Sequence, residues 1–390
     1  MKRGIATFTL DEGKCPPWLF QRMVKLGRDI VEILVAEYGP NEFVRRLSDP
    51  VWFQSLGTVL AFDWNASGLT TILTASLKEA IKHEERNLGI FICGGKGKTS
   101  RRTPDEIFDW GEKIGLGDEK TKALVYNSKM SAKVDSALVQ DGFQIYHHSF
   151  IFSRGGAWTV VQQGMNTANQ TARRYHWFSE NVHDLVCEPH SGISSRLVEK
   201  NVLNMVSKKS SESRSLSVEM VNSGVNSLMK DVNIIRKHFS RFSNMISLES
   251  GKEQMTLLDL DRGEFKYHPM VHEDFIMNKY LDKILREVAF QNPSNYEKMV
   301  ALRGVGPKTV RALALVGEII YGAKPSYEDP ARYSFAHGGK DGTPFPVDLK
   351  TYDETIGILK GAVMKTRWSR EEKRKAVSKI EASPLKAGSN

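Results

Sequence analysis

Two strand-like runs flank a short polar turn in the middle of the chain, and they constrain the fold more than any other feature. The runs are residues 143–151 and 158–163, and the turn between them is Ser153-Arg154-Gly155-Gly156. Aromatic and β-branched side chains favour strands, and a short connection containing glycine favours an antiparallel hairpin. The centre of the chain is therefore predicted to form a β-hairpin.

Segments with helical and strand-like patterns precede this hairpin. A helix is predicted to begin after Pro16-Pro17 and to end near Gly39-Pro40, and another covers about 70–86. The short apolar runs 57–62 and 88–93 predict buried strands.

Thr103-Pro104-Asp105-Glu106 has the form of a capping box with proline at the first helical position, so a helix should begin there. A longer helix is predicted over 118–140. Strands that alternate with helices and end in a hairpin indicate an α/β fold with a mixed sheet.

The second half of the chain is mostly helical in pattern. Residues 207–217 are polar and predict a mobile segment, whereas 218–245 has helical spacing and predicts a connector. Helical patterns continue over 270–365, interrupted at 322–347 by a loop rich in Gly and Pro. The predicted organisation is an α/β catalytic domain at 1–200, a connector at 201–250, an all-α domain at 251–365 and a basic tail at 366–390.

The charge balance narrows the class of partner. Lys and Arg exceed Asp and Glu by 55 − 46 = 9 residues, which favours a polyanion such as nucleic acid. Cys15, Cys93 and Cys187 lie far apart without a CxxC pair, which argues against an iron–sulfur cluster, a zinc finger and a disulfide scaffold. The chain has no signal-peptide stretch and no apolar run of transmembrane length, so we expect a cytoplasmic protein without membrane contact.

A glycine-rich turn lies between two predicted helices, about 294–301 and 308–321. The sequence Leu302-Arg303-Gly304-Val305-Gly306-Pro307-Lys308-Thr309 resembles the L-x-G-V-G-x-K-T consensus of the helix-hairpin-helix in DNA repair proteins. The first N–H groups of the second helix, the positive end of its dipole and Lys308 are suited to bind a phosphate oxygen. The resemblance implies an all-α helix-hairpin-helix domain that contacts the DNA backbone through Gly304, Gly306, Lys308 and Thr309. The alternative is a helix corner whose glycines only relieve crowding.

The same motif suggests a second chemistry. In helix-hairpin-helix glycosylases that also cut the strand, the motif lysine attacks the sugar and a downstream aspartate assists. Lys308 and Asp348 occupy similar places here, although they are 40 residues apart and no histidine follows the aspartate. A glycosylase/AP lyase therefore stays open as an alternative function.

Two further segments are candidates for DNA contact. Residues 94–102 hold four cations and three glycines, but Ile92 stands where a P-loop requires its first glycine. This segment predicts anion binding by Lys96, Lys98, Arg101 and Arg102, against the alternative of a solvated loop. Arg173 and Arg174 are followed by aromatic side chains, an interleaving that is typical of nucleic-acid surfaces.

Polar side chains concentrate between residues 135 and 190, where strands are ordinarily apolar. Phosphodiester cleavage requires a metal or a general base to prepare water, and cations to neutralise the transition state. Each such residue is more often structural when taken alone. As a group, the candidate catalytic residues are Asp63, Asp135, Asp141, His148, His176, Glu188 and His190. Because Mg²⁺ and Mn²⁺ prefer oxygen ligands, Asp63 and Glu188 are the candidate metal ligands.

Several stretches together resemble one family, the prokaryotic and largely archaeal domain of unknown function 763. They are AFDWNASG (61–68), CGGKGKTSRRTPDE (93–106), AKVDSALVQDGF (132–143), VVQQGMN (160–166), ARRYHW (172–177) and EPH (188–190). The resemblance covers most of the first 350 residues and implies a DNA-directed role, with nuclease activity proposed. Asn65 stands where the family has histidine, and His272 stands alone where it often has a histidine pair.

The function predicted from the sequence is DNA processing, with DNA repair as its setting, by a metal-dependent nuclease that cleaves structured or single-stranded DNA. The glycosylase/AP lyase and a non-enzymatic DNA-binding protein are the alternatives. The sequence leaves open whether the protein acts as a homodimer.

Overall fold

The computed structural model describes residues 15–61, 68–168, 170–195, 198–200, 202–239, 279–331, 333–334 and 349–382. The longer helices are α1 (Pro17–Leu47), α2 (Pro50–Ala61), α3 (Gly68–Ala80), α5 (Thr103–Lys113), α6 (Asp118–Ala137), α7 (Ser211–Asn222), α8 (Val225–Phe239), α12 (Lys279–Gln291), α13 (Tyr296–Ala301), α14 (Pro307–Tyr321), α15 (Leu349–Lys365) and α16 (Arg370–Ala382). Short helical turns are α4 (Glu85–Leu88), η1 (Gly97–Arg102), η2 (Ser179–Asn181) and η3 (Lys208–Ser210). The strands are β1 (Ile90–Lys96), β2 (Val139–Gln140), β3 (Gln144–Ser153), β4 (Trp158–Asn166), β5 (Thr171–Phe178), β6 (His190–Ser195), β7 (Leu203–Asn204) and β8 (Tyr333–Ser334).

One sheet with the order β1-β3-β4-β5-β6-β8 organises the molecule. The neighbours from β1 to β6 pair antiparallel, and only the two-residue strand β8 pairs parallel, with β6. The sheet is therefore antiparallel except at one edge. The predicted β-hairpin is confirmed as β3 and β4, which are joined at residues 154–157.

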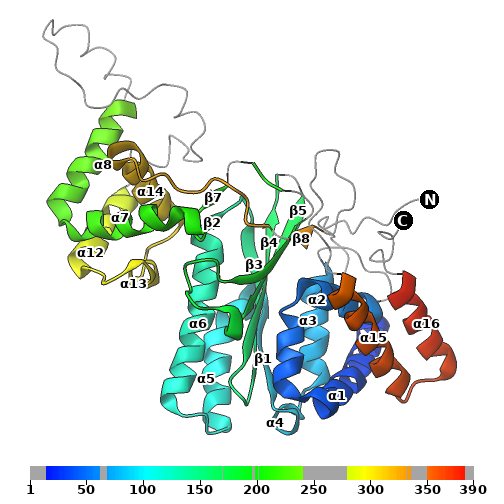
Figure 1. Cartoon of the computed structure of the whole chain (residues 1–390). Helices are drawn as coiled ribbons and strands as arrows, with labels where there is room; N and C mark the ends of the chain where they lie inside the picture. The colour runs from blue at the N-terminus through cyan, green and yellow to red at the C-terminus, as the bar shows by residue number, and fades with distance from the viewer. Residues whose placement is uncertain are drawn as a thin grey trace, which may run out of the picture.

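Helices cover both faces of the sheet (Figure 1). α1, α2 and α3 form one core with Ile90, Ile92, Ile151 and Val161 of the strands, and α15 and α16 pack against the same helices. On the other face, α5 and α6 pack on Phe91, Phe150 and Trp177, and this second core continues into α7, α8, α12, α13 and α14. Because both faces are buried, polar residues on a strand do not indicate a solvent-facing side.

The predicted strand at 57–62 is wrong. Residues 50–61 form helix α2, in which Thr58 Oγ1 donates to the Gln54 carbonyl at 3.0 Å. A short apolar run fits a buried helix as well as a buried strand. The second strand prediction is confirmed as β1, and the helices predicted at Thr103 and 118–140 are confirmed as α5 and α6.

The predicted helix end at Gly39-Pro40 is a kink within α1. Gly39 has φ of 81°, and the helix resumes at Pro40 and continues to Leu47. Proline suits the first turn of a resumed helix because that turn needs no backbone donor.

The segment 207–217 was expected to be mobile, and the structure contradicts this. It forms η3 and the first part of α7, where Ser210, Ser213 and Ser217 are buried. Arg214 Nη1 donates to the carbonyls of Met205 and Ser207, both at 2.7 Å. Small side chains allow close helix packing here, and the Ser210 and Ser217 hydroxyls donate to backbone carbonyls, which polarity alone does not reveal.

The chain thus combines many helices with an antiparallel sheet. The predicted split into an α/β domain and a separate all-α domain is not confirmed, because the core around α6 runs on into α7 and α14. Helix α15 lies within the predicted all-α domain, yet it packs against α1 and α2. Among the residues that the structure describes, no helix is long and apolar enough to cross a membrane.

Candidate functional site

The predicted catalytic residue Asp135 lies at the centre of a buried hydrogen-bond cluster between α6 and the sheet. Its Oδ1 lies 2.5 Å from His190 Nε2, and its Oδ2 accepts from Trp177 Nε1 at 3.0 Å and from Gln162 Nε2. Asp135 is fully buried and both of its oxygens are engaged.

The same cluster contains the predicted catalytic residue His148. Its Nδ1 lies 3.0 Å from Gln162 Oε1 and its Nε2 lies 2.9 Å from Ser128 Oγ. Burial lowers the pKa of His148 and keeps the ring neutral. The structure therefore brings Asp135, His148 and His190 together, as a set of groups that satisfy one another.

Asp141 and Arg173 form a second buried group on this face. Asp141 Oδ2 accepts from Arg173 Nη1 at 2.8 Å and from the Tyr175 hydroxyl at 2.7 Å. Arg173 also forms a two-nitrogen ion pair with Asp329 at 2.8 and 2.7 Å. Because Arg173 is fully buried, its predicted role as a DNA contact does not fit the structure.

Arg174 and His176 are buried on the opposite face, beneath α2 and α3. Arg174 Nε donates to His176 Nε2 at 2.8 Å, so the proton of His176 is on Nδ1, which lies 3.2 Å from the Leu47 carbonyl. Arg174 Nη1 also contacts Gln54 Oε1 at 3.2 Å. Burial lowers the pKa of Arg174 to about 9. A fully buried guanidinium does not offer the predicted DNA contact.

The proposed metal ligands are not brought together in the described part of the chain. Asp63 lies outside the described residues, as do His272 and Asp348. Glu188 is partly exposed, and its carboxylate lies 3.5 Å from Lys208 Nζ. Within the described ranges, no three His, Cys, Asp or Glu side chains are grouped so that they could hold a metal ion.

A row of polar residues crosses the sheet on the face covered by α1, α2 and α3. Directly paired positions on five neighbouring strands form it, namely Lys96, His147, Gln163, Arg174 and Ser194. Lys96 is exposed at the edge strand, whereas the other four are buried. His147 Nδ1 and Ser194 Oγ have no hydrogen-bond partner among the described residues.

A cavity of about 840 Å³ lies at the exposed end of this row, beside the edge strand β1. Its walls come from α3, α5, β1 and β3. Thr74 and Ser149 line it, and each places its hydroxyl within 3.2 Å of the buried His147 Nε2. Burial lowers the pKa of His147 to about 3, so the ring beneath the cavity is neutral.

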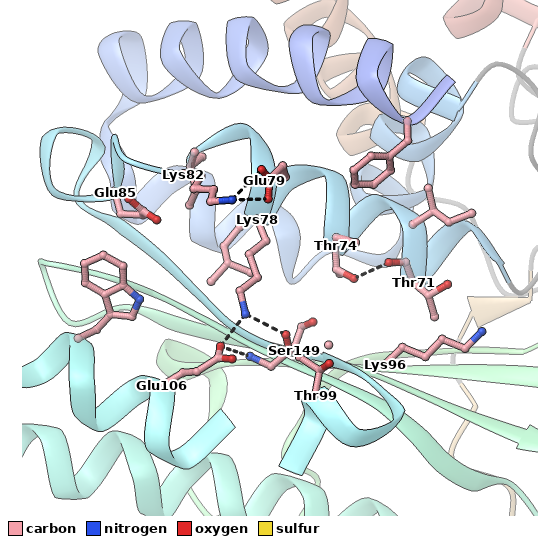
Figure 2. Close-up of a pocket in the computed structure, with 18 of the residues that line it drawn as sticks. Thr71, Thr74, Lys78, Glu79, Lys82, Glu85, Lys96, Thr99, Glu106 and Ser149 are labelled. Carbon is pink, nitrogen blue, oxygen red and sulfur yellow. Dashed lines mark hydrogen bonds and ion pairs between the residues drawn. The ribbon is translucent and has the colours of Figure 1, made fainter. Parts of the chain in front are cut away.

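An ion pair crosses the middle of this cavity (Figure 2). Lys78 Nζ lies 2.6 Å from Glu106 Oε2 and donates to the Gly94 carbonyl at 3.1 Å. The same Glu106 oxygen accepts the Gly94 N–H at 2.9 Å. The predicted capping box is therefore wrong in its chemistry, since Glu106 reaches across to β1 and α5 has no side-chain cap. Sequence reasoning missed Lys78 because a lysine on a helix has no distinguishing pattern.

The glycine-rich segment 94–102 borders this cavity through Gly94, Gly95, Lys96 and Thr99. It is the end of β1 followed by η1, with Lys98, Arg101 and Arg102 exposed. Gly94 has φ of 85°, and a Cβ there would lie 2.3 Å from both the His148 carbonyl oxygen and Thr103 Oγ1. Glycine is thus required where the strand passes between α5 and β3.

The predicted turn between two helices is present as residues 302–306, between α13 and α14. Gly304 has φ of 89°, and a Cβ there would lie 2.3 Å from Ile284 Cδ1 of α12. Gly306 has φ of −146° and open space around it, so its backbone does not require glycine.

Helix α6 and strand β2 hold the base of this turn. Lys133 Nζ donates to the Leu302 carbonyl at 2.5 Å, and Gln140 Nε2 donates to the Pro307 carbonyl at 3.0 Å. Arg303 and Lys308 are exposed, whereas the Thr309 side chain is only 3% exposed and is not available as the predicted DNA contact.

One comparison with known proteins identifies the chain. A family model described as Protein of unknown function (DUF763) matches residues 4–347. No curated protein and no solved structure matches the chain. The match spans most of the sequence and agrees with the resemblance seen in its motifs, so the chain belongs to the DUF763 family.

Proposed function

We propose that this protein binds DNA through the sugar-phosphate backbone at the turn between α13 and α14, in the manner of a helix-hairpin-helix. The observation that carries the proposal is the exposed turn: Gly304 packs on Ile284, while Arg303 and Lys308 face solvent. Backbone N–H groups at a helix start and nearby cations together suit a phosphate oxygen. The excess of 9 positive charges over the whole chain supports a polyanionic partner.

The test is fluorescence anisotropy with labelled duplex DNA over a range of salt concentrations. Arg303→Ala/Lys308→Ala should weaken binding equally for unrelated sequences. It should also reduce the slope of log K against log salt by about 0.9 for each phosphate that the variant no longer neutralises. Lys120→Ala is the matched control, since Lys120 is an exposed lysine of α6 outside the turn. An unchanged slope and affinity in the double variant would remove the turn from DNA binding.

Substitutions at the two glycines of the same turn test the role of backbone geometry without changing the charge. Gly304→Ala should weaken DNA binding without removing a cation, because its Cβ displaces Ile284 and φ is positive. Gly306→Ala should bind normally because its site is open. Circular dichroism of both variants checks that each remains folded.

The second candidate function is metal-dependent cleavage of the bound DNA, which we place in the cavity beside β1. The supporting observation is that Glu106 and Lys78 lie in an accessible cavity, whereas Asp135 and Asp141 are buried. A carboxylate can act as a general base or as one of the few protein ligands that Mg²⁺ or Mn²⁺ needs when phosphates supply the rest. Lysines beside it can stabilise the charge that develops on the phosphate.

Cleavage is tested with end-labelled single-stranded and duplex DNA in Mg²⁺, Mn²⁺ or EDTA. Glu106→Gln should lower the rate by about 100-fold, the size expected for loss of a general base. Glu112→Gln is the matched control, because Glu112 is an exposed carboxylate of α5 that does not line the cavity. Absence of cleavage with every metal, or full activity of Glu106→Gln, would overturn this proposal.

The glycosylase/AP lyase alternative requires a neutral amine at Lys308. A lysine nucleophile is ordinarily activated by a dry or strongly cationic pocket, and the Lys308 side chain is exposed. We therefore assign phosphate binding to Lys308. Asp348, the other residue of that alternative, lies outside the described residues.

A further inference from the structure

We infer that the cavity beside β1 binds a single nucleotide carrying a phosphate, with the phosphate at the Lys96 end and the base against Trp110. In a DNA-processing protein such a nucleotide is the terminal one of a strand, and in solution it is a free mononucleotide. The link to strand ends rests on the cleavage proposed above, whereas nucleotide binding stands independently of it.

The size of the cavity sets the first limit on its ligand. Its volume of about 840 Å³ falls within the range of roughly 300–1,000 Å³ that small-molecule sites occupy. Helices α3 and α5 and the strands β1 and β3 wall it in. A space of this size is large enough for one nucleotide.

The two ends of the cavity differ in chemistry. Figure 2 shows Lys96 and Thr71 at one end and Glu85 and Lys82 at the other, with the Lys78–Glu106 pair between them. Lys96 Nζ lies 5.8 Å from the centre of the Tyr146 ring, and no carboxylate among the described residues pairs with it. A phosphate is the group that a lysine beside hydroxyl donors recognises best.

Three hydroxyl side chains line the phosphate end, and a phosphate there would compete with the Gly68 carbonyl for the Thr71 hydrogen. Thr71, Thr99 and Ser149 line the cavity on its α3, η1 and β3 sides. Ser149 Oγ lies 3.1 Å from Nε2 of the buried His147, so the ring fixes this hydroxyl from below. His147 and Ser149 thus connect the cavity to the polar row that crosses the sheet.

The opposite end supplies a surface for a base. Trp110 lies one helical turn beyond Glu106 on α5 and lines the same cavity. Its ring is held against Phe91, with ring centres 5.0 Å apart, and Lys113 Nζ lies 5.1 Å from the ring centre. A base would stack on this ring in place of Lys113 Nζ, and the nearby Asp109 can accept from an exocyclic amino group such as that of cytosine.

The route to the phosphate end is basic. Lys98, Arg101 and Arg102 are exposed on η1, immediately after Lys96. Cations along the rim attract the backbone of a strand whose last nucleotide occupies the cavity. This arrangement favours the end of a single strand over an internal site.

Isothermal titration calorimetry of the full chain in EDTA tests nucleotide binding without any catalytic readout. We expect 5′-dCMP to bind at least about tenfold more tightly than deoxycytidine or inorganic phosphate, because only dCMP fills both ends. Lys96→Ala should weaken dCMP binding by at least about tenfold, whereas the control Lys120→Ala should leave it unchanged. Failure of dCMP to bind at millimolar concentration, or equal binding by Lys96→Ala, overturns the inference.

Strand-end recognition is tested separately with linear and circular single-stranded DNA of one sequence. Cleavage of the linear form alone supports the terminal nucleotide as the substrate. Equal cleavage of both forms overturns end recognition and leaves the proposed nuclease intact. Cleavage of neither form, together with tight dCMP binding, overturns the nuclease and leaves the nucleotide site.

Discussion

The two covered faces of the central sheet carry similar polar residues. On one face they form a closed hydrogen-bond cluster, and on the other they lead into a cavity. On the α6 face, Asp135 accepts from three neighbours and the cluster around it is closed. On the α3 face, the row that begins at Lys96 opens into a cavity and contains buried atoms without partners at His147 and Ser194, among the residues described. A histidine or a carboxylate inside a sheet is therefore informative only together with its hydrogen-bond partners and its access to solvent.

The largest expected effect comes from the closed face. Asp135→Ala leaves His190, Trp177 and Gln162 without their acceptor in a buried site. Each orphaned buried group costs on the order of 1–3 kcal/mol, so the free energy of unfolding should fall by about 4 kcal/mol. Urea denaturation measures this change.

Asp118→Ala serves as the control for that substitution, because the Asp118 side chain is 83% exposed at the start of the same helix. Its unfolding free energy should change by less than about 0.5 kcal/mol. If Asp135→Ala instead kept its stability and abolished DNA cleavage, the closed cluster would be the active site and the distinction between the two faces would be wrong.

The sequence predicted the parts of the fold that depend on local signals. The β-hairpin at 153–156 and the helix start at Thr103 follow from turn and helix-start residues that act within a few positions. The strand expected at 57–62 was wrong because an apolar run does not distinguish two kinds of buried element. The mobile segment expected at 207–217 was wrong because buried serines pack as tightly as apolar residues when their hydroxyls bond to the backbone.

Less of the candidate site than of the fold could be predicted from the sequence. Arg173 and Arg174 lie in a motif typical of nucleic-acid surfaces, yet each is buried on one of the two covered faces of the sheet. The ion pair between Lys78 and Glu106 joins residues from different helices, so only the three-dimensional fold brings it into view. Lys96 was predicted to bind an anion, and it lines a cavity that the sequence does not reveal.

A smaller expected effect is a pH dependence of stability that arises at His147. The pKa of His147 is about 3 in the folded protein because burial disfavours the charged ring, against an ordinary value near 6.5. The unfolded chain therefore binds a proton between these pH values that the folded chain does not, and stability is lost as the pH falls below 6.5. At 1.36 kcal/mol per pH unit, His147 alone accounts for about 2 kcal/mol between pH 6.5 and 5.

Urea denaturation at several pH values measures this loss, and His147→Asn should reduce it by about 2 kcal/mol at pH 5. His183→Asn is the matched control, because it makes the same substitution at an exposed histidine. Phosphate binding in the cavity adds a more specific test. A phosphate bound beside Thr74 and Ser149 favours protonation of the ring beneath them, so saturating dCMP should shift the pH dependence in the wild type and leave it unshifted in His147→Asn. An equal shift of the pH dependence in the wild type and in His147→Asn would mean that the nucleotide binds away from His147.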